Sequence, residues 1–253
     1  MSSDVHAFVN SLPNKSNYVI DIGASSGAGT AYPLLCDEAY SGIAIECAAG
    51  NCEKLKESVR NSKIHIHQGF ATPESICSIL QSYNAPHSPD LIKIDIDGYD
   101  LQVLRSILTS YRPKVIYAEI NEKIPPPIHF EILYNPDYFW DGSHCFGFSV
   151  AAGNTVMNEH GYAILQIHGG NNILCVDKQL LSPGTNVRDV NTLYDQDYKY
   201  NRSRSFFPWN EDVNYWLEMD NSYKLVDAIH EYFTKFNPRG KPVLPSLFDL
   251  HIA

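Results

Sequence analysis

The sequence predicts an α/β fold built on a doubly wound, mostly parallel sheet. A β-branched run at residues 18–22 ends in a loop of glycine and small residues at 23–29. Two later runs, 91–97 and 114–121, stay apolar until their last residues, which are acids or an amide. Apolar runs that end in this way are typical of buried parallel strands. Amphipathic stretches between the runs supply the helices that cover such a sheet.

Periodicity and turn residues place the remaining elements. Ser3 is the expected N-cap of a first helix, and Pro33 is tolerated in the first turn of the second. His168-Gly-Gly-Asn-Asn172 between two apolar runs predicts a hairpin. Strands are expected at 18–22, 42–46, 64–67, 91–97, 114–121, 162–167 and 172–176, and helices at 4–12, 30–40, 51–59, 101–108, 149–160 and 225–236.

The composition of this 253-residue chain argues against some classes of binding partner. Its formal charge is −10 and it has no basic run, which argues against a nucleic-acid backbone or an anionic membrane as the main partner. The six cysteines include no CxxC pair and no zinc spacing, and no signal peptide is visible. Reduced thiols in a cytoplasmic protein are therefore expected. No apolar run reaches the roughly 18 residues that a membrane span needs.

The loop after the first strand has the composition of a nucleotide-binding turn. Gly23, Gly27 and Gly29 allow positive φ angles and close approach of a ligand. The NAD fingerprint Gly-x-Gly-x-x-Gly fails because Tyr32 stands at its third glycine. The pattern that remains, Asp-x-Gly-x-x-x-Gly-x-Gly from Asp21, resembles motif I of class I S-adenosylmethionine (SAM) methyltransferases. A loop that only turns the chain is the alternative.

Two residues farther along are placed to hold an adenosine. Glu46 ends the second strand about 20 residues past the glycine loop, where the ribose-binding acid lies in this fold class. A carboxylate there can accept from both ribose hydroxyls, and a surface glutamate is the alternative. Phe70 follows the third strand and could stack on adenine or belong to the core.

The segment Lys93-Ile-Asp-Ile-Asp-Gly-Tyr-Asp-Leu-Gln-Val-Leu104, with the glycine loop and Ile45-Glu46 before it, resembles the FkbM-type branch of these methyltransferases. That family typically has Lys-Ile-Asp-(Ile/Val)-Glu-Gly-x-Glu-x-x-Val-Leu here, and Asp97 and Asp100 are shorter acids at its glutamate positions. A subset with Asp-Ile-Asp-Gly and a later Glu-x-Asn-x-x-Ile-Pro-Pro is closer still. The resemblance covers residues 17–180 and implies a Rossmann-like sheet of seven strands in the order 3-2-1-4-5-7-6.

The resemblance also implies SAM as the cofactor. The glycine loop would hold the amino-acid end of SAM, with Asp21 close behind it, directly or through water on the amine. Glu46 would bind the ribose, and Phe70 with Ala71 would flank the adenine. The complete set expected around the cofactor is Asp21, Gly23, Ala24, Ser25, Gly27, Glu46, Cys47, Gly69, Phe70, Ala71 and Asp95.

Polar residues at the ends of the fourth and fifth strands predict a ledge at the carboxyl edge of the sheet. Asp95 and Asp97 share one strand face, as do Glu119 and Asn121. Asp95, Glu119 and Asn121 offer the hard oxygen ligands that suit Mg²⁺. Some FkbM-type enzymes use such a metal to orient and acidify a substrate diol. Alternatively, Asp95 and Asp97 bind the methionine amine or cap local backbone.

Residues 122–148 are an aromatic-rich insertion that begins with the stiff segment Ile124-Pro-Pro-Pro127. We expect it to roof the substrate pocket as a lid, which is compatible with a small core of its own. Within it, Asp141 and His144 stand three apart and are expected to face one site. Histidine titrates near neutral pH, so His144 is the candidate base, although single loop histidines usually have no special role.

Asp141, His144 and Asp95 are thus the candidate catalytic residues, and His168 and Asn171 at the hairpin turn are second candidates. The sequence predicts a SAM-dependent methyltransferase that acts on an O or N atom of a small molecule, such as a natural product or a sugar. A catalytically silent SAM-fold binding protein and, less favoured, a nicotinamide oxidoreductase are the alternatives.

The methyltransferase domain is expected to span residues 1–181, followed by an extension at 182–253. This extension is polar and tyrosine-rich, and it contains a helical stretch. Its other marked features are Arg188, Arg202, Arg204 and the aromatic segment 205–210. It either covers the active site or joins two copies of the chain in a homodimer, and the residues do not decide between these roles.

Overall fold

The computed structural model describes residues 5–201, 208–237 and 240–252. The predicted cap Ser3, the start of the first helix at Asp4, Arg202, Arg204 and residues 205–207 of the aromatic segment lie outside these ranges. The chain divides into two compact units, one of Met1–Ile96 and Val103–Ala118, the other of Asp97–Gln102 and Glu119–Ala253.

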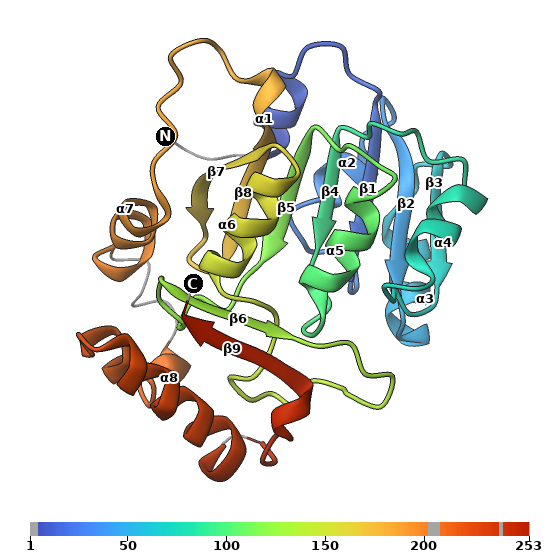
Figure 1. Ribbon diagram of the computed structural model, residues 1–253. Helices are drawn as coiled ribbons and strands as arrows, with labels where there is room; N and C mark the ends of the chain where they lie inside the picture. Colours follow the sequence, from blue (N-terminus) through green and yellow to red (C-terminus); the bar gives the residue numbers. More distant parts are fainter. Residues whose placement is uncertain (1–4, 202–207, 238–239, 253) are drawn as a thin grey trace. The chain divides into compact units, whose positions relative to one another are not determined.

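Five parallel strands build the first unit, and Figure 1 shows them side by side. They are β1 (Tyr18–Ile22), β2 (Ser41–Glu46), β3 (Ile64–Gln68), β4 (Leu91–Ile94) and β5 (Val115–Glu119). Every residue of β1 and of β4 is buried, as expected for strands in the middle of a parallel sheet. β1 pairs with β2 on one side and with β4 on the other, which places the glycine loop mid-sheet.

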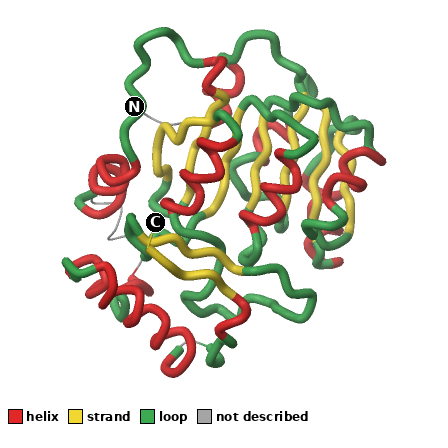
Figure 2. Tube along the Cα trace, viewed as in Figure 1, coloured by secondary structure: helices red, strands yellow, loops and turns green. Residues whose placement is uncertain are grey.

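Helices alternate with these strands along the chain (Figure 2). They are α1 (Val5–Asn10), α2 (Tyr32–Cys36), α3 (Ala49–Ser58), α4 (Ile76–Ser82) and α5 (Asp100–Leu108). The expected helix at 30–40 is shorter in the structure because the chain becomes extended at Asp37. The sequence analysis did not predict α4. Asp100 opens α5, and its Oδ2 accepts from Gly98 N at 2.9 Å.

The described part of the second unit contains four strands, β6 (Ile128–Ile132), β7 (Tyr162–His168), β8 (Asn172–Asp177) and β9 (Phe248–Ile252). Its helices are α6 (Val150–Glu159), α7 (Val190–Tyr194) and α8 (Ser222–Glu231). Short helical turns lie at Lys178–Leu180, Asp195–Lys199, Pro208–Asn210, Asn214–Glu218, Tyr232–Phe236 and Pro245–Leu247. Ser149 caps α6, since its Oγ accepts from Ala152 N at 3.2 Å.

The strand order of the seven-stranded sheet is β3-β2-β1-β4-β5-β8-β7. β7 and β8 form the expected antiparallel hairpin, with one register shift between Ile164 and Gln166. They are the sixth and seventh strands of the predicted sheet, because β6 lies in the insertion and pairs with β9 in a separate two-stranded sheet. The α/β fold and its predicted strand order are confirmed.

The insertion and the C-terminal extension share one hydrophobic core within the second unit. Its buried side chains are Ile124, Ile128, Phe130, Ile132, Cys145, Val213, Trp216, Leu225, Ile229, Tyr232, Phe233, Val243 and Phe248. Phe139 and Trp140 of the insertion are exposed. The insertion therefore has the core that was expected as one alternative, and the extension completes it.

Among the described residues, no helix combines the length and the apolar character that crossing a membrane requires.

Candidate functional site

The loop after β1 is folded tightly against the ends of β2 and β4. Gly23 has a φ of +75°, and a Cβ atom at this position would lie 1.7 Å from the carbonyl oxygen of Asp95. Gly23 N and Ala24 N both donate to Ile45 O, at 2.9 and 3.1 Å. Gly27, with a φ of +88°, donates from its N–H to Ala24 O at 3.2 Å. Glycine is therefore required where the loop passes Asp95.

Glu46 ties the glycine loop to the end of β2. Its Oε2 accepts from Ser25 N at 2.8 Å, and its Oε1 accepts from Ala48 N at 2.8 Å. The side chain is buried, with 7% of the residue exposed, which excludes a surface glutamate. Oε1 also accepts from Cys47 Sγ at 3.7 Å, whereas Oε2 keeps acceptor capacity for one further donor. The ribose role stays a prediction, but the carboxylate is held where the loop turns.

Lys93 is the residue of this site that sequence reasoning missed. Its Nζ donates to Gly23 O at 2.8 Å and lies 3.5 Å from Asp21 Oδ1 and 3.4 Å from Asp95 Oδ2. Burial alone would lower the pKa of Lys93, but Asp21 and Asp95 outweigh it and the pKa is raised. Lys93 and Asp95 are two apart on one strand, so their shared face was the available signal.

Asp21 has little contact with water at the end of β1. Only 1% of the residue is exposed, and burial raises its pKa against the lowering effect of Lys93. Its Oδ1 has no hydrogen-bond partner among the described residues. Such a buried acceptor can take a donor from a ligand amine.

The segment expected around adenine follows β3. Gly69 N donates to Glu46 O at 3.0 Å, which brings this turn to the end of β2. Phe70 is 53% exposed, so it is not a core aromatic, while Ala71 is buried. Cys47 as a whole residue is exposed, but its sulfur is partly buried. This partial burial, together with the nearby Glu46 carboxylate, raises the pKa of the Cys47 thiol. These residues are available to flank a ring, and that role stays a prediction.

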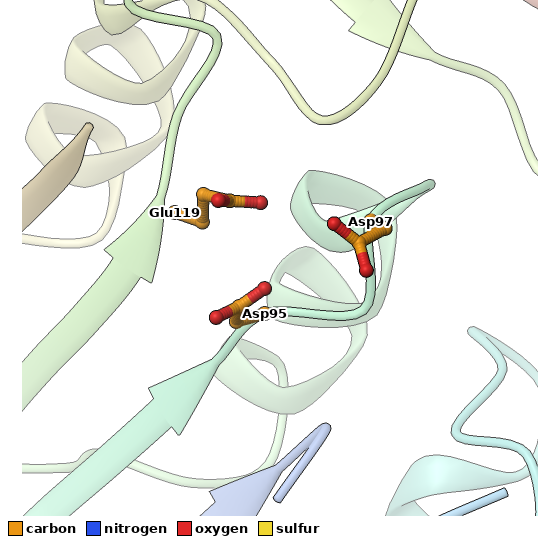
Figure 3. Close-up of side chains that lie close together, drawn as sticks. All are labelled: Asp95, Asp97 and Glu119. Atoms are coloured by element: carbon orange, nitrogen blue, oxygen red, sulfur yellow. The ribbon is translucent and has the colours of Figure 1, made fainter. Parts of the chain in front are cut away.

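Three carboxylates gather at the ends of β4 and β5 (Figure 3). One oxygen from each of Asp95, Asp97 and Glu119 lies within 4.8 Å of the others. Ile94 pairs with Ala118, so the next residue on each strand stands beside the other. Asp97 has a φ of +55° where the chain turns away from the strand.

Asn121, the third metal ligand expected from the sequence, makes other contacts. Its Nδ2 donates to His144 O at 2.8 Å and to Phe146 O at 3.0 Å, both in the insertion. Asn171 donates from Nδ2 to Glu119 Oε1 at 2.9 Å, so this second candidate does reach the carboxylates. Burial lowers the pKa of His168.

The prediction that Asp141 and His144 face one site is wrong. His144 is buried, and its Nε2 lies 3.0 Å from Oδ1 of Asp212, whose Oδ2 accepts from Tyr232 O–H at 2.5 Å. Asp141 is exposed and accepts instead from Ser143 N at 3.1 Å and Lys241 N at 2.8 Å. Burial acts to raise the pKa of Asp141, but these hydrogen bonds outweigh it and the pKa is lowered.

The partner of His144 lies 68 residues away in the sequence, which no local pattern could indicate.

Residues 71–164 match the family model described as the methyltransferase FkbM domain. This range contains the carboxylates of the strand ends and the whole insertion. No curated protein matches the chain.

Several solved structures are similar in fold. The methyltransferase domain of bacterial CtHen1-C is 17% identical, with a TM-score of 0.42 over 68% of this chain and 93% of that one. SAM-bound CalS10, an amino pentose methyltransferase from Micromonospora echinaspora, is 9% identical, with a TM-score of 0.43 over 69% and 89% of the two chains. The mitomycin 7-O-methyltransferase MmcR is 16% identical, with a TM-score of 0.40 over 68% and 52%.

Structural similarity at these TM-scores does not indicate function. The family match over residues 71–164 includes the motif from Lys93 to Leu104. Residues 71–164 of this chain are therefore similar to the methyltransferase FkbM domain.

Proposed function

We propose that this protein transfers the methyl group of SAM to an oxygen or nitrogen atom of a small molecule, such as a natural product or a sugar. The observation that carries the proposal is the fixed carboxylate of Glu46, which is hydrogen-bonded to the glycine loop at Ser25 N. A buried carboxylate of fixed orientation can accept hydrogen bonds from the two ribose hydroxyls, and the neighbouring glycine loop leaves room for the ligand. Asp21, with its buried Oδ1, is the acceptor for the amine of SAM.

The residues of the glycine loop and its neighbours suit the chemistry of SAM. SAM supplies an electrophilic methyl group, so the protein has to bind, orient and exclude water rather than form a covalent intermediate. Gly23 and Ala24 fix the loop through Ile45 O, and Lys93 fixes its carbonyl side through Gly23 O. Hydrogen bonds therefore hold the loop on both sides.

Asp95, Asp97 and Glu119 are the acceptor side of the proposed site. Their three carboxylates suit Mg²⁺, which prefers oxygen ligands and would supply the Lewis acidity that lowers the pKa of an acceptor hydroxyl. Because His144 is buried against Asp212, we assign proton removal to this carboxylate group rather than to His144. An acidic group favours a metal-bridged polyol or a cationic acceptor over a bare carboxylate.

Replacing Glu46 with glutamine should weaken SAM binding about tenfold to a hundredfold, because charge-assisted hydrogen bonds to the ribose would be lost. Isothermal calorimetry with SAM measures this, with NAD as a second ligand. Glu53→Gln is the matched control, since Glu53 lies on the surface of α3 in an exposed pair with Lys56. Denaturation curves separate lost binding from a loosened loop. Binding of NAD without SAM would refute the proposal.

Replacing Asp97 with asparagine or Glu119 with glutamine should lower Mg²⁺-dependent turnover about a hundredfold while SAM affinity changes less than about twofold. Asp137→Asn, at an exposed position of the insertion, is the control. The measurement is methyl transfer to a panel of polyols, phenols and amines, with and without EDTA. Activity that EDTA leaves unchanged would exclude the metal, and SAM binding without turnover on any acceptor would favour a silent binding protein.

A further inference from the structure

A second group of metal-binding side chains lies on the two-stranded sheet of the second unit. His129 stands directly opposite His251, and Glu131 stands opposite Asp249, in the register of β6 with β9. Residues two apart on a strand share a face, so these four side chains project from the same face of the sheet. We propose that His129 and His251 bind a divalent ion such as Zn²⁺, Ni²⁺ or Cu²⁺, with Asp249 in support.

The spacing of the two imidazole rings supports one shared ion. Their centroids are 5.1 Å apart. An imidazole nitrogen lies about 2.0–2.1 Å from zinc, which puts the ring centre about 3.2 Å from the ion, and a tetrahedral angle then separates two ring centres by about 5 Å. The observed distance between the ring centres matches this value.

A carboxylate supports one of the two rings. Asp249 Oδ1 lies 3.3 Å from His251 Nδ1. A carboxylate on one ring nitrogen fixes the tautomer and the ring orientation, an arrangement common at metal sites. The His251 and Asp249 side chains are each 52% exposed, so an ion can reach them from water.

The His129 ring also lies beside α6, where Thr155 Oγ1 is 3.3 Å from its Nε2. The donor set is rich in nitrogen, which favours borderline ions over the Mg²⁺ suited to the carboxylates of β4 and β5. Because β9 comes from the extension and β6 from the insertion, a bound ion would clamp the two segments together. Metal binding at this site should therefore stabilise the folded chain.

The test titrates Zn²⁺ and Ni²⁺ into the full chain by calorimetry, with Mg²⁺ in excess to occupy oxygen-rich sites. His129→Ala and His251→Ala should each weaken binding at least about tenfold, and Asp249→Asn should weaken it less. Wild type should gain several degrees in Tm with Zn²⁺, a gain that both histidine variants lose. His230→Ala, on α8, is the matched control and should bind like wild type.

His65 and His67 on β3 are the competing histidine pair, since both rings lie against Tyr83, the residue that follows α4. The double variant His65→Ala/His67→Ala should therefore keep the wild-type affinity and the Tm gain. Binding that survives both His129→Ala and His251→Ala, or no binding at metal concentrations up to about 100 μM, would overturn the proposal. Failure here would leave the SAM site untouched, because none of these residues belongs to it.

Discussion

Replacing Gly23 with alanine should destabilise the protein by about 3 kcal/mol or more and abolish SAM binding. The added Cβ would lie 1.7 Å from the carbonyl oxygen of Asp95 and 2.7 Å from its carbonyl carbon. Both are backbone atoms, and Asp95 N is held by a hydrogen bond of 3.1 Å to Ile22 O. The clash therefore cannot be relieved by rotating a side chain, and the φ of +75° adds strain for any residue with a Cβ.

The matched control is Gly29→Ala in the same loop. No atom lies within 4 Å of a Cβ built at Gly29, so its effect should stay within about 0.5 kcal/mol. Urea denaturation gives the free energy of unfolding for both variants, and calorimetry gives SAM affinity for whichever remains folded. A Gly23→Ala variant as stable as wild type would show that the loop does not pack against β4 in this way.

The central sheet could be predicted because its signals are local. The β-branched run of β1 is buried throughout, and three of the four polar residues expected at the ends of β4 and β5, namely Asp95, Asp97 and Glu119, lie close together. The positive φ angles of Gly23 and Gly27 could also be predicted, because glycine adopts such angles without strain. In each case a short stretch determines both the conformation and the end of the element.

Contacts between distant segments could not be predicted in this way. β6 pairs with β9 across more than a hundred residues, and the sequence analysis predicted neither strand. His144 and Asp212 belong to different segments of the second unit. The sequence could not show that Asn121 would hold the insertion backbone while Asp97 joined the carboxylates, because both are polar residues just beyond a strand.

Replacing Lys93 with methionine should cost about 3–5 kcal/mol of stability at neutral pH. Methionine keeps most of the apolar stem, so the main loss is the charge that Asp21 and Asp95 share. Asp21 would then be a buried carboxylate with no cation beside it. The carbonyl of Gly23 would also lose its donor, which should weaken SAM binding through the loop. Lys56→Met, in an exposed pair with Glu53, should change stability by less than about 0.5 kcal/mol.

The pH dependence distinguishes lost charge from lost packing at Lys93. Burial raises the pKa of Asp21 above 3.8 in the folded state, and Lys93 opposes that rise. A raised folded pKa means that this acid's contribution to stability is fully present below the unfolded value and is lost as pH rises through the folded value. Without Lys93 the folded pKa rises further, so the loss at neutral pH grows and fades again as Asp21 becomes protonated. Urea denaturation at about pH 7 and about pH 4.5 should therefore show wild type and Lys93→Met converging in acid, whereas an equal difference at both pH values would assign the effect to packing.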